Sequence, residues 1–489
     1  VVNVSVRVPT VSRGPYLQNG TTNAVTVRWR TDLPTESVVR CGTAVGDLQT
    51  VEHLAVATTE HEVRLTGLQA GTRYFYSIGS SRQTFATGAD YSFVTSPATN
   101  KPARIWVLGD SGTANLDAAA VRDAYYTFNG THDTDLWLML GDNAYLSGLD
   151  SEFQHAVFDM YPEMLRKSVL WPALGNHETY SADLNGRFAY LEIFSPPTAG
   201  EAGGVPSGTR NYYSFNFANI HFVCLDSMTM DRTTNGVMLA WLREDLAANN
   251  SDWLIAYWHH PPYSKGSHDS DWEYELVEMR ENVLPILESY GVDLVLCGHS
   301  HGYERSFLLD GHYGTSDTLV PEMIKDAGDG RPFGTGPYIK DLGLSPKQGA
   351  VYVVAGSSGQ VSWGSFDHPA MYISMPQLGS LVLDIDNQAL NVKFLTDSAA
   401  IADSFTIAKG VSRPVLELTS VAVVNETVTL KWNSMPGARY QVQRSSSLFS
   451  SDWTVISGTI RAPTSKTTWS QPLTYPADTS FYRVVQINE

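Results

Sequence analysis

The stretch that decides the fold reads Ile105-Trp106-Val107-Leu108-Gly109-Asp110-Ser111-Gly112, an apolar run that ends in a glycine and a carboxylate. Four more apolar runs are ended by a glycine or a histidine: LWLML before Gly141-Asp142-Asn143-Ala144-Tyr145, VLWPAL before Gly175-Asn176-His177-Glu178, WLIAYW before His259-His260-Pro261-Pro262-Tyr263, and VDLVLC before Gly298-His299-Ser300-His301. Such runs favour buried parallel strands that deliver their carboxyl ends to loops. Because open α/β sheets build their sites at that edge, we predict that the five motifs form one shared site.

Seven side chains in these motifs have lone pairs that suit metal ions: Asp110, Asp142, Tyr145, Asn176, His259, His299 and His301. Seven are too many for one zinc ion, which usually takes four ligands, and the carboxylate and phenolate oxygens favour a harder ion. If one carboxylate bridges two ions, each ion receives four protein atoms and keeps positions open for water and substrate. Two ions about 3.5–4 Å apart are the known arrangement for in-line displacement at phosphorus. The motifs therefore predict a binuclear hydrolase.

In their order, the motifs resemble those of the purple acid phosphatases, which belong to the calcineurin-like metallophosphoesterases. The pattern GDxG, GDxxY, GNH(D/E), a histidine ahead of Pro-x-Tyr, and GHxH followed by Tyr303-Glu304-Arg305 is complete in this chain. Residues 13–97 resemble the β-sandwich that precedes the catalytic domain in the larger, plant-type members. The resemblance covers roughly residues 13–408, and five motifs in order are far more specific than one alone.

The resemblance implies a role for each ligand. The first ion, which is Fe(III) in this family, would be held by Asp110, Tyr145 and His301. The second, a divalent Zn, Mn or Fe ion, would be held by Asn176, His259 and His299, and Asp142 would bridge the two. The doubled His259-His260 leaves a choice, and counting back from Pro261 and Tyr263 favours His259.

Two further histidines are predicted to be catalytic. His177 follows the ligand Asn176, so its side chain should lie near the cluster and contact the substrate phosphate. His268 follows the fourth motif on a polar loop, and its family counterpart helps to bind phosphate and protonates the leaving oxygen, a task that suits an imidazole at mildly acidic pH. Many relatives have two adjacent histidines there, whereas this chain has one followed by Asp269. The alternative for His268 is a solvated loop histidine.

Other polar residues of the motifs are expected to be structural. Glu178 is predicted to support the site rather than to bind metal, and Tyr303, Glu304 and Arg305 to buttress the last motif. The histidines outside the motifs are expected to have structural roles. For His368 the alternative is a position in a loop at the rim of the site.

The chain shows three segments. Residues 1–97 carry short alternating strands, and residues 68–74 resemble the tyrosine corner of a fibronectin type III sandwich. Residues 103–409 alternate strand-like runs with helical stretches at 237–249 and 273–290, as α/β proteins do. Residues 415–489 echo the first segment, because residues 428–432 repeat the pattern of 25–29. Linkers are expected at 96–102 and 409–414.

We therefore predict a multidomain protein with a central α/β metallophosphoesterase domain flanked by two all-β, fibronectin III-like sandwiches. The resemblance implies a four-layer αββα sandwich for the central domain. Its second sheet should be completed by the strand-rich tail that contains AVYVVAGSSG, GSLVLDI and LNVKFL.

Composition agrees with an extracellular enzyme of about three domains. The net charge of −18 argues against nucleic acid or an anionic membrane as a partner, and no apolar run has the length of a membrane span. Three cysteines, Cys41, Cys224 and Cys297, give little support for a disulfide framework. The chain begins at Val1 without a signal sequence, which we expect of a processed or trimmed form, and the family implies a secreted or periplasmic location.

The function that we predict is hydrolysis of phosphate monoesters by in-line attack of a metal-bound hydroxide. A phosphodiesterase or nucleotide pyrophosphatase on the same scaffold is the alternative among enzymes. The alternative of another class is an adhesive β-sandwich protein with an inactive central domain. The C-terminal segment is predicted to be a spacer or a cap packed on the catalytic domain. The alternative is that it contacts polysaccharide or a cell surface through Trp453 and Trp469.

Overall fold

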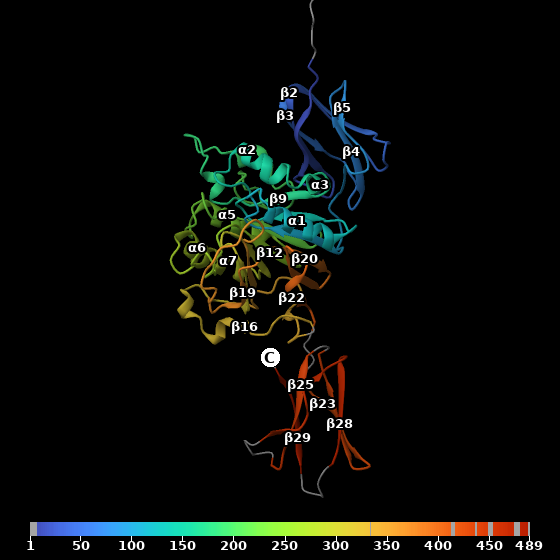
Figure 1. Ribbon diagram of the computed structural model, residues 1–489, viewed down its shortest axis with the longest axis vertical. Helices are drawn as coiled ribbons and strands as arrows, with labels where there is room; N and C mark the ends of the chain where they lie inside the picture. The colour runs from blue at the N-terminus through green and yellow to red at the C-terminus, as the bar shows by residue number, and fades with distance from the viewer. Residues whose placement is uncertain are drawn as a thin grey trace, which may run out of the picture. The chain divides into compact units, whose positions relative to one another are not determined.

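The computed structural model describes residues 7–332, 334–411, 416–435, 438–447, 453–473 and 480–487 (Figure 1). It has two compact units. The first comprises Val1–Lys325, Gly343–Asn387 and Val392–Asp403, and the second comprises Asp326–Leu342, Gln388–Asn391 and Ser404–Glu489. The predicted linker at 409–414 lies partly outside the described residues.

The N-terminal part of the first unit is all β (blue in Figure 1). Its strands are β1 (Val11–Gln18), β2 (Val25–Gly42), β3 (Thr50–Leu65), β4 (Arg73–Gly79), β5 (Thr84–Ala86) and β6 (Ser92–Val94). The long strand β2 pairs antiparallel with β1, β3 and β4, and it buries Trp29 against the ring of His61. The backbone N–H of Gln69 donates to Tyr74 Oη at 2.9 Å, which is the hydrogen bond of a tyrosine corner.

The first sheet of the α/β part contains three parallel neighbours, β7 (Ala103–Leu108), β8 (Leu136–Met139) and β9 (Val169–Pro172). Strand β1 joins this sheet at β9 through the pair Leu17 and Val169. Side chains of β7 and β8 pack in one core with helices α1 (Leu116–Asn129), α2 (Asp150–Phe153), α3 (Pro162–Leu165) and α4 (Ala189–Ile193). A π-helical turn at Gln154–Phe158 continues α2.

The second sheet has the order β10-β11-β12-β13-β18-β14-β19. Its strands are β10 (Tyr213–Phe217), β11 (Ile220–Cys224), β12 (Trp253–Tyr257), β13 (Leu294–Cys297), β14 (Tyr303–Ser306), β18 (Val351–Ala355) and β19 (Met371–Met375). Helices α5 (Val237–Ala248) and α7 (Leu284–Ser289) pack on it in a second core, and α7 continues α6 (Tyr274–Glu278) through a π-helical turn at Met279–Val283. A short ladder joins β15 (Leu308–Leu309) and β16 (Ile324–Asp326).

The two sheets contact each other through aromatic side chains. Trp171 of β9 stacks on Phe215 of β10 at 3.7 Å, and Tyr303 of β14 stacks on Phe394 of β21 (Ala389–Thr396) at 4.1 Å. Helices therefore pack on each sheet, and the sheets pack on each other.

The prediction for the tail after His312 was partly wrong. AVYVVAGSSG supplies β18 of the second sheet, as expected. GSLVLDI, however, forms β20 (Gly379–Asp386), which lies antiparallel beside β7, and β21 follows it in that first sheet. Trp106 Nε1 donates to Ser380 Oγ at 3.0 Å, so a buried polar contact supports the pairing that we did not predict.

The second unit contains β17 (Tyr338–Lys340), which is parallel to the end of β22 (Ile401–Lys409), and two antiparallel sheets; β22 enters this unit at Ser404. One sheet consists of β23 (Leu418–Val424), β24 (Thr427–Asn433) and β28 (Lys466–Pro472). The other consists of β25 (Arg439–Ser445), β26 (Thr454–Val455), β27 (Ile460–Arg461) and β29 (Phe481–Ile487). A core around Trp432 lies between them, and Met435 N–H donates to Tyr440 Oη at 2.9 Å.

Cys41, Cys224 and Cys297 are all buried and free of disulfides. Among the described residues, every helix is too short or too polar to cross a bilayer.

Candidate metal centre

The five motifs meet at the carboxyl ends of strands from both sheets. Asp110, Asp142 and Asn176 follow β7, β8 and β9 of the first sheet, whereas His259 and His299 follow β12 and β13 of the second. The N–H of His299 donates to Asp110 Oδ2 at 2.8 Å, so the two sheets are joined directly at the site. We expected one sheet edge from the strand pattern, and the structure instead brings two edges together.

Three of the predicted ligands have left-handed backbone conformations. The φ angles are 56° at Asp110, 51° at Asp142 and 67° at His299. Residues other than glycine rarely adopt such angles, and strained positions of this kind cluster at functional sites. The backbone thus turns sharply at the strand end to aim each side chain at the cluster.

All seven predicted ligands lie together, in two groups. In the first group, Tyr145 Oη lies 3.1 Å from Asp110 Oδ1 and 3.3 Å from His301 Nε2. In the second, His259 Nε2 lies 3.0 Å from Asn176 Oδ1 and 3.2 Å from His299 Nδ1.

Asp142 lies between the two groups. Its Oδ2 atom is 3.0 Å from Tyr145 Oη and 3.4 Å from His259 Nε2. Its Oδ1 atom accepts the backbone N–H of His177 at 3.0 Å. One carboxylate oxygen therefore touches both groups, which is the position that a bridging ligand needs.

Hydrogen bonds behind the ligands fix which atom faces the cluster. His259 Nδ1 lies 3.0 Å from the carbonyl of Leu140, which can only accept, so Nδ1 carries a proton and Nε2 is the atom that faces the cluster. Asn176 Nδ2 donates to Tyr180 Oη at 2.8 Å, which turns Asn176 Oδ1 toward His259. His301 Nδ1 lies 3.1 Å from Ser362 Oγ, so its Nε2 atom is directed to the cluster.

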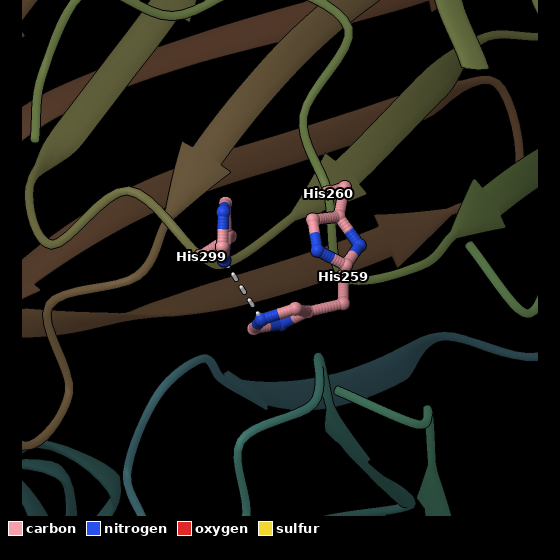
Figure 2. A group of neighbouring side chains, drawn as sticks. All are labelled: His259, His260 and His299. Atoms are coloured by element: carbon pink, nitrogen blue, oxygen red, sulfur yellow. Dashed lines mark hydrogen bonds between the residues drawn. The ribbon is translucent and has the colours of Figure 1, made fainter. Parts of the chain in front are cut away.

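The contacts of the doubled histidine favour His259 as the ligand. His260 Nδ1 lies 2.8 Å from Ser227 Oγ, away from Asp142, whereas His259 contacts Asp142 and Asn176. Figure 2 shows His259 and His299 facing each other across their hydrogen bond, with His260 alongside. His260 still belongs to a set with His259 and His299 whose ligand atoms lie within 4.8 Å of one another.

The residues present fit metal ions. Asp110 and Asp142 are buried, and in the described part of the chain their ion-pair partners are histidines only. Burial alone would lower the pKa of His259, but the charges of Asp142 and Asp110 raise it to about 9. Burial lowers the pKa of His299 to about 4, so that imidazole is neutral and can act as a ligand. Two buried carboxylates without a lysine or arginine leave negative charge that cations would balance.

Glycines around the cluster make room for close approach. A Cβ atom on Gly298 would lie 2.4 Å from Asp110 Oδ2, and one on Gly141 would lie 2.7 Å from His259 Nδ1. These positions can therefore hold only glycine without moving a predicted ligand.

His177 lies at the edge of the centre. Its Nδ1 atom lies 2.6 Å from the carbonyl of Leu146, so Nδ1 carries a proton. Its Nε2 atom lies 3.8 Å from Asp142 Oδ2, and a quarter of the side chain is exposed. His177 can thus reach a substrate that enters from solvent.

His268 stands over the second group of ligands. Its ring lies 3.7 Å from the ring of His299, and about a third of its side chain is exposed. His268 Nδ1 and Glu273 Oε2 are 2.7 Å apart, and the same oxygen lies 3.4 Å from His299 Nε2. Burial opposes ionisation of Glu273, but the hydrogen bonds from His268 and His299 lower its pKa below the ordinary range.

Glu273 was missed from the sequence because no motif contains it. The chain turns between His268 and Glu273, where Asp269 N–H donates to Glu273 Oε1 at 2.9 Å, and the carboxylate folds back onto the histidines. Gln360 and Ser362, which contact His301, were missed as well. They lie about sixty residues beyond it, and no local signal points to them.

The predicted supporting residues are placed as follows. Glu178 is buried and accepts the backbone N–H groups of Asp142, Asn143 and Gly175, so it joins two ligand loops. Arg305 and Tyr303 both bind Asp403, and Glu304 accepts from Ser264. His368 is buried and lies near the rings of Tyr263 and His312, so it is not on the rim.

Two family descriptions match this chain. Calcineurin-like phosphoesterase matches residues 103–303, and the N-terminal domain of purple acid phosphatases matches residues 14–95. Purple acid phosphatase 15 of Arabidopsis thaliana is 32% identical over 276 residues, which are 50% of this chain and 49% of that relative. Purple acid phosphatase 23 of the same plant is 31% identical over 276 residues, covering 50% and 57%. The chain thus spans about half the length of these relatives.

Solved structures share the fold. A purple acid phosphatase, PPD1, from yellow lupin (Lupinus luteus) seeds superposes with a TM-score of 0.60 at 18% identity, over 82% of this chain and 74% of that one. PhoD superposes with a TM-score of 0.57 at 13% identity, over 82% and 92%. At these identities the likeness is one of fold.

Proposed function

We propose that this chain, a member of the purple acid phosphatase family of calcineurin-like phosphoesterases, hydrolyses phosphate monoesters at a binuclear metal centre. The observation that carries the proposal is the position of Asp142. Its Oδ2 atom lies 3.0 Å from Tyr145 Oη and 3.4 Å from His259 Nε2, between two groups of buried oxygen and nitrogen ligands.

The ligand set suggests unlike ions. The group of Asp110, Tyr145 and His301 includes a phenolate and a carboxylate, which suit a hard trivalent ion such as Fe(III). The group of Asn176, His259 and His299 has two imidazoles and an amide, which suit Zn, Mn or Fe(II). When bound, the two ions would supply Lewis-acid stabilisation of the phosphoryl oxygens and a water nucleophile whose pKa is lowered toward ~7.

The histidines at the edge would handle the substrate. His177 would donate a hydrogen bond from Nε2–H to a phosphoryl oxygen, which requires a proton on Nε2 in addition to the Nδ1 proton that faces the carbonyl of Leu146. His268, held at Nδ1 by Glu273, would use its other nitrogen to protonate the leaving oxygen. Glu273 would stabilise the protonated imidazole and fix its orientation over His299.

A direct test compares substrates and metal content on the purified chain. The protein is stripped with a chelator, reloaded with iron and zinc, and assayed on phenyl phosphate and on the diester bis(phenyl) phosphate. We expect activity to vanish on stripping, to return on reloading, and to favour the monoester. Turnover that survived complete metal removal would contradict the metal centre, and hydrolysis of the diester alone would make the chain a phosphodiesterase.

We further infer the domain organisation 1–97, 103–409 and 415–489, with fibronectin type III-like sandwiches at both ends. The supporting observation is that the same corner occurs twice, where Gln69 N–H donates to Tyr74 Oη and Met435 N–H donates to Tyr440 Oη, each over five residues. Limited proteolysis near residues 97–103 and 409–415 tests these boundaries. Export from the cell is inferred from the family, and fractionation of the native host tests it.

A further inference from the structure

Two tryptophans on separate loops are almost fully exposed. Trp272 is 82% exposed and Trp363 is 85% exposed. Large aromatic side chains bury much area when they can, and exposed ones are common where a surface binds a ligand. Both residues are close in sequence to groups that contact histidines of the metal centre.

Trp272 directly precedes Glu273, the carboxylate shared by His268 and His299. Consecutive Cα atoms lie about 3.8 Å apart, so the two side chains start from neighbouring points of one turn. Trp272 N–H donates to the carbonyl of Asp269 at 3.2 Å, which fixes this turn. Trp272 therefore belongs to the turn whose next residue, Glu273, contacts His268, the residue that we place at the leaving oxygen.

Trp363 directly follows Ser362, which contacts His301 twice. Ser362 Oγ lies 3.1 Å from His301 Nδ1, and Ser362 N–H donates to the carbonyl of His301 at 2.9 Å. The loop is also anchored to the loop of His268, since Phe366 N–H donates to the carbonyl of Lys265 at 2.7 Å. The backbones of the two loops lie so close together that a Cβ atom on Gly364 would collide with the carbonyl oxygen of Gly266.

The charge on the His268 loop is unfavourable for anions. Asp269, Asp271 and Glu273 lie within five residues of His268, and the one lysine nearby, Lys265, already pairs with Asp269 at 3.5 Å and Asp271 at 3.0 Å. These carboxylates would repel a leaving group that carries further phosphates, whereas they would not repel an uncharged ring. Flat apolar surface and acidic surroundings together favour a neutral, planar leaving group.

We propose that Trp272 and Trp363 bind the leaving group of the substrate and make the enzyme prefer phosphate monoesters with an uncharged aromatic leaving group. This proposal rests on the phosphoesterase function proposed above. Stacking on each ring strengthens binding of the ester without changing the bond that breaks. KM should therefore respond to loss of a tryptophan, and kcat should not.

The test uses the metal-loaded full chain with Trp272→Ala and Trp363→Ala. Each substitution should raise KM for phenyl phosphate by about two- to tenfold, the range expected for one aromatic contact, with kcat nearly constant. KM for glycerol 2-phosphate should not change. The matched control is Val56→Ala on β3, which removes another side chain that is 78% exposed but far from the motifs in sequence.

A second readout needs no turnover. Calorimetry should show that benzylphosphonate binds the wild type more tightly than methylphosphonate, and that the advantage shrinks in both tryptophan variants. A wild type that hydrolyses neither ester would contradict the phosphoesterase function, and the phosphonate comparison would still decide on the tryptophans. Equal affinities for the two phosphonates, or equal KM changes on both esters, would overturn the proposal.

Discussion

At the residue scale, the centre depends on side chains that are each held by a second contact. Asp142 is the clearest case, because Glu178 accepts its backbone N–H at 3.1 Å while Oδ1 accepts the N–H of His177. The free oxygen, Oδ2, then faces Tyr145 and His259. Ligands fixed in this way need little reorganisation to receive cations.

Tyr145→Phe should remove the colour that an Fe(III) phenolate would give. Tyr145 Oη touches Asp110, Asp142 and His301, so the phenolate is the group that would bind iron in the first position. We expect the visible absorption band of the iron-loaded protein to disappear in the variant, while some metal remains bound.

Absorption spectra together with elemental analysis check this result. An unchanged band in Tyr145→Phe would assign the colour to another ligand, and a colourless but active wild type would exclude iron(III) at that position.

His268→Ala should reduce turnover according to the leaving group. If His268 donates the proton, its loss should lower kcat/KM by roughly 10²–10⁴-fold for alkyl phosphates. The loss should be small for p-nitrophenyl phosphate, because its leaving group needs no proton. Glu273→Gln should show the same leaving-group dependence more weakly, since Glu273 acts through His268. Equal losses on both substrates would restrict His268 to binding.

At the scale of elements, the sequence predicted strands well and their partners less well. The runs ahead of the five motifs became β7, β8, β9, β12 and β13, because uninterrupted apolar runs bounded by glycine or histidine suit buried parallel strands. The assignment of β20 and β21 to a sheet failed. Strand β20 is buried along most of its length and β21 alternates in burial over its first six residues, and nothing local in either pattern says which distant strand is the neighbour.

The same limit applies to the site. That the residues of the five motifs would lie together could be predicted, because each motif follows an apolar strand and carries polar side chains at its end. Glu273, Gln360 and Ser362 could not, because each reaches a histidine through loop geometry that appears only in three dimensions.

Glu288 lies in the last turn of α7, and its buried environment predicts that the stability of the protein depends on pH. Its carboxylate accepts from Tyr313 Oη at 2.6 Å, Tyr352 Oη at 2.5 Å and Gly311 N–H at 2.8 Å. Burial nevertheless raises its pKa from 4.5 to about 7. Because the folded pKa is the higher one, the stabilisation is complete below about pH 4.5 and is lost as pH rises through about 7.

Between pH 5 and 8, the free energy of unfolding should therefore fall less in Glu288→Gln than in the wild type, and the difference should reach up to about 3 kcal/mol. Thermal unfolding of variant and wild type at equal metal loading measures the effect. The matched control is Glu281→Gln, an exposed carboxylate in the π-helical turn ahead of α7. If stability changed with pH as steeply in Glu288→Gln as in the wild type, protonation of Glu288 would not contribute to the pH dependence.

At the scale of the whole molecule, every group assigned to the chemistry lies between Asp110 and Trp363, within the first compact unit. The net charge of −18 does not attract phosphate esters, so under the proposed function their capture would depend on cations bound at the centre. The polysaccharide contact predicted for the C-terminal segment gains no support, since Trp469 packs against the core and Arg483 covers Trp453 at 4.4 Å.

A chain that ends at Lys409 should keep its metals and its turnover on small soluble esters. It retains β22 in full and lacks only the two sheets of β23–β29. Metal analysis and steady-state kinetics on phenyl phosphate check this expectation, with circular dichroism to establish that the shortened chain is folded. A folded but inactive product would mean that the C-terminal segment contributes to the site.

The metal stoichiometry of Asp142→Ala tests whether Asp142 bridges two metal ions. Elemental analysis of the reloaded wild type should give close to two ions per chain. Asp142→Ala should lose both and with them most activity, because Oδ2 is the atom that touches both ligand groups. Asp142→Ala protein that still held two ions and turned over near the wild-type rate would contradict the account.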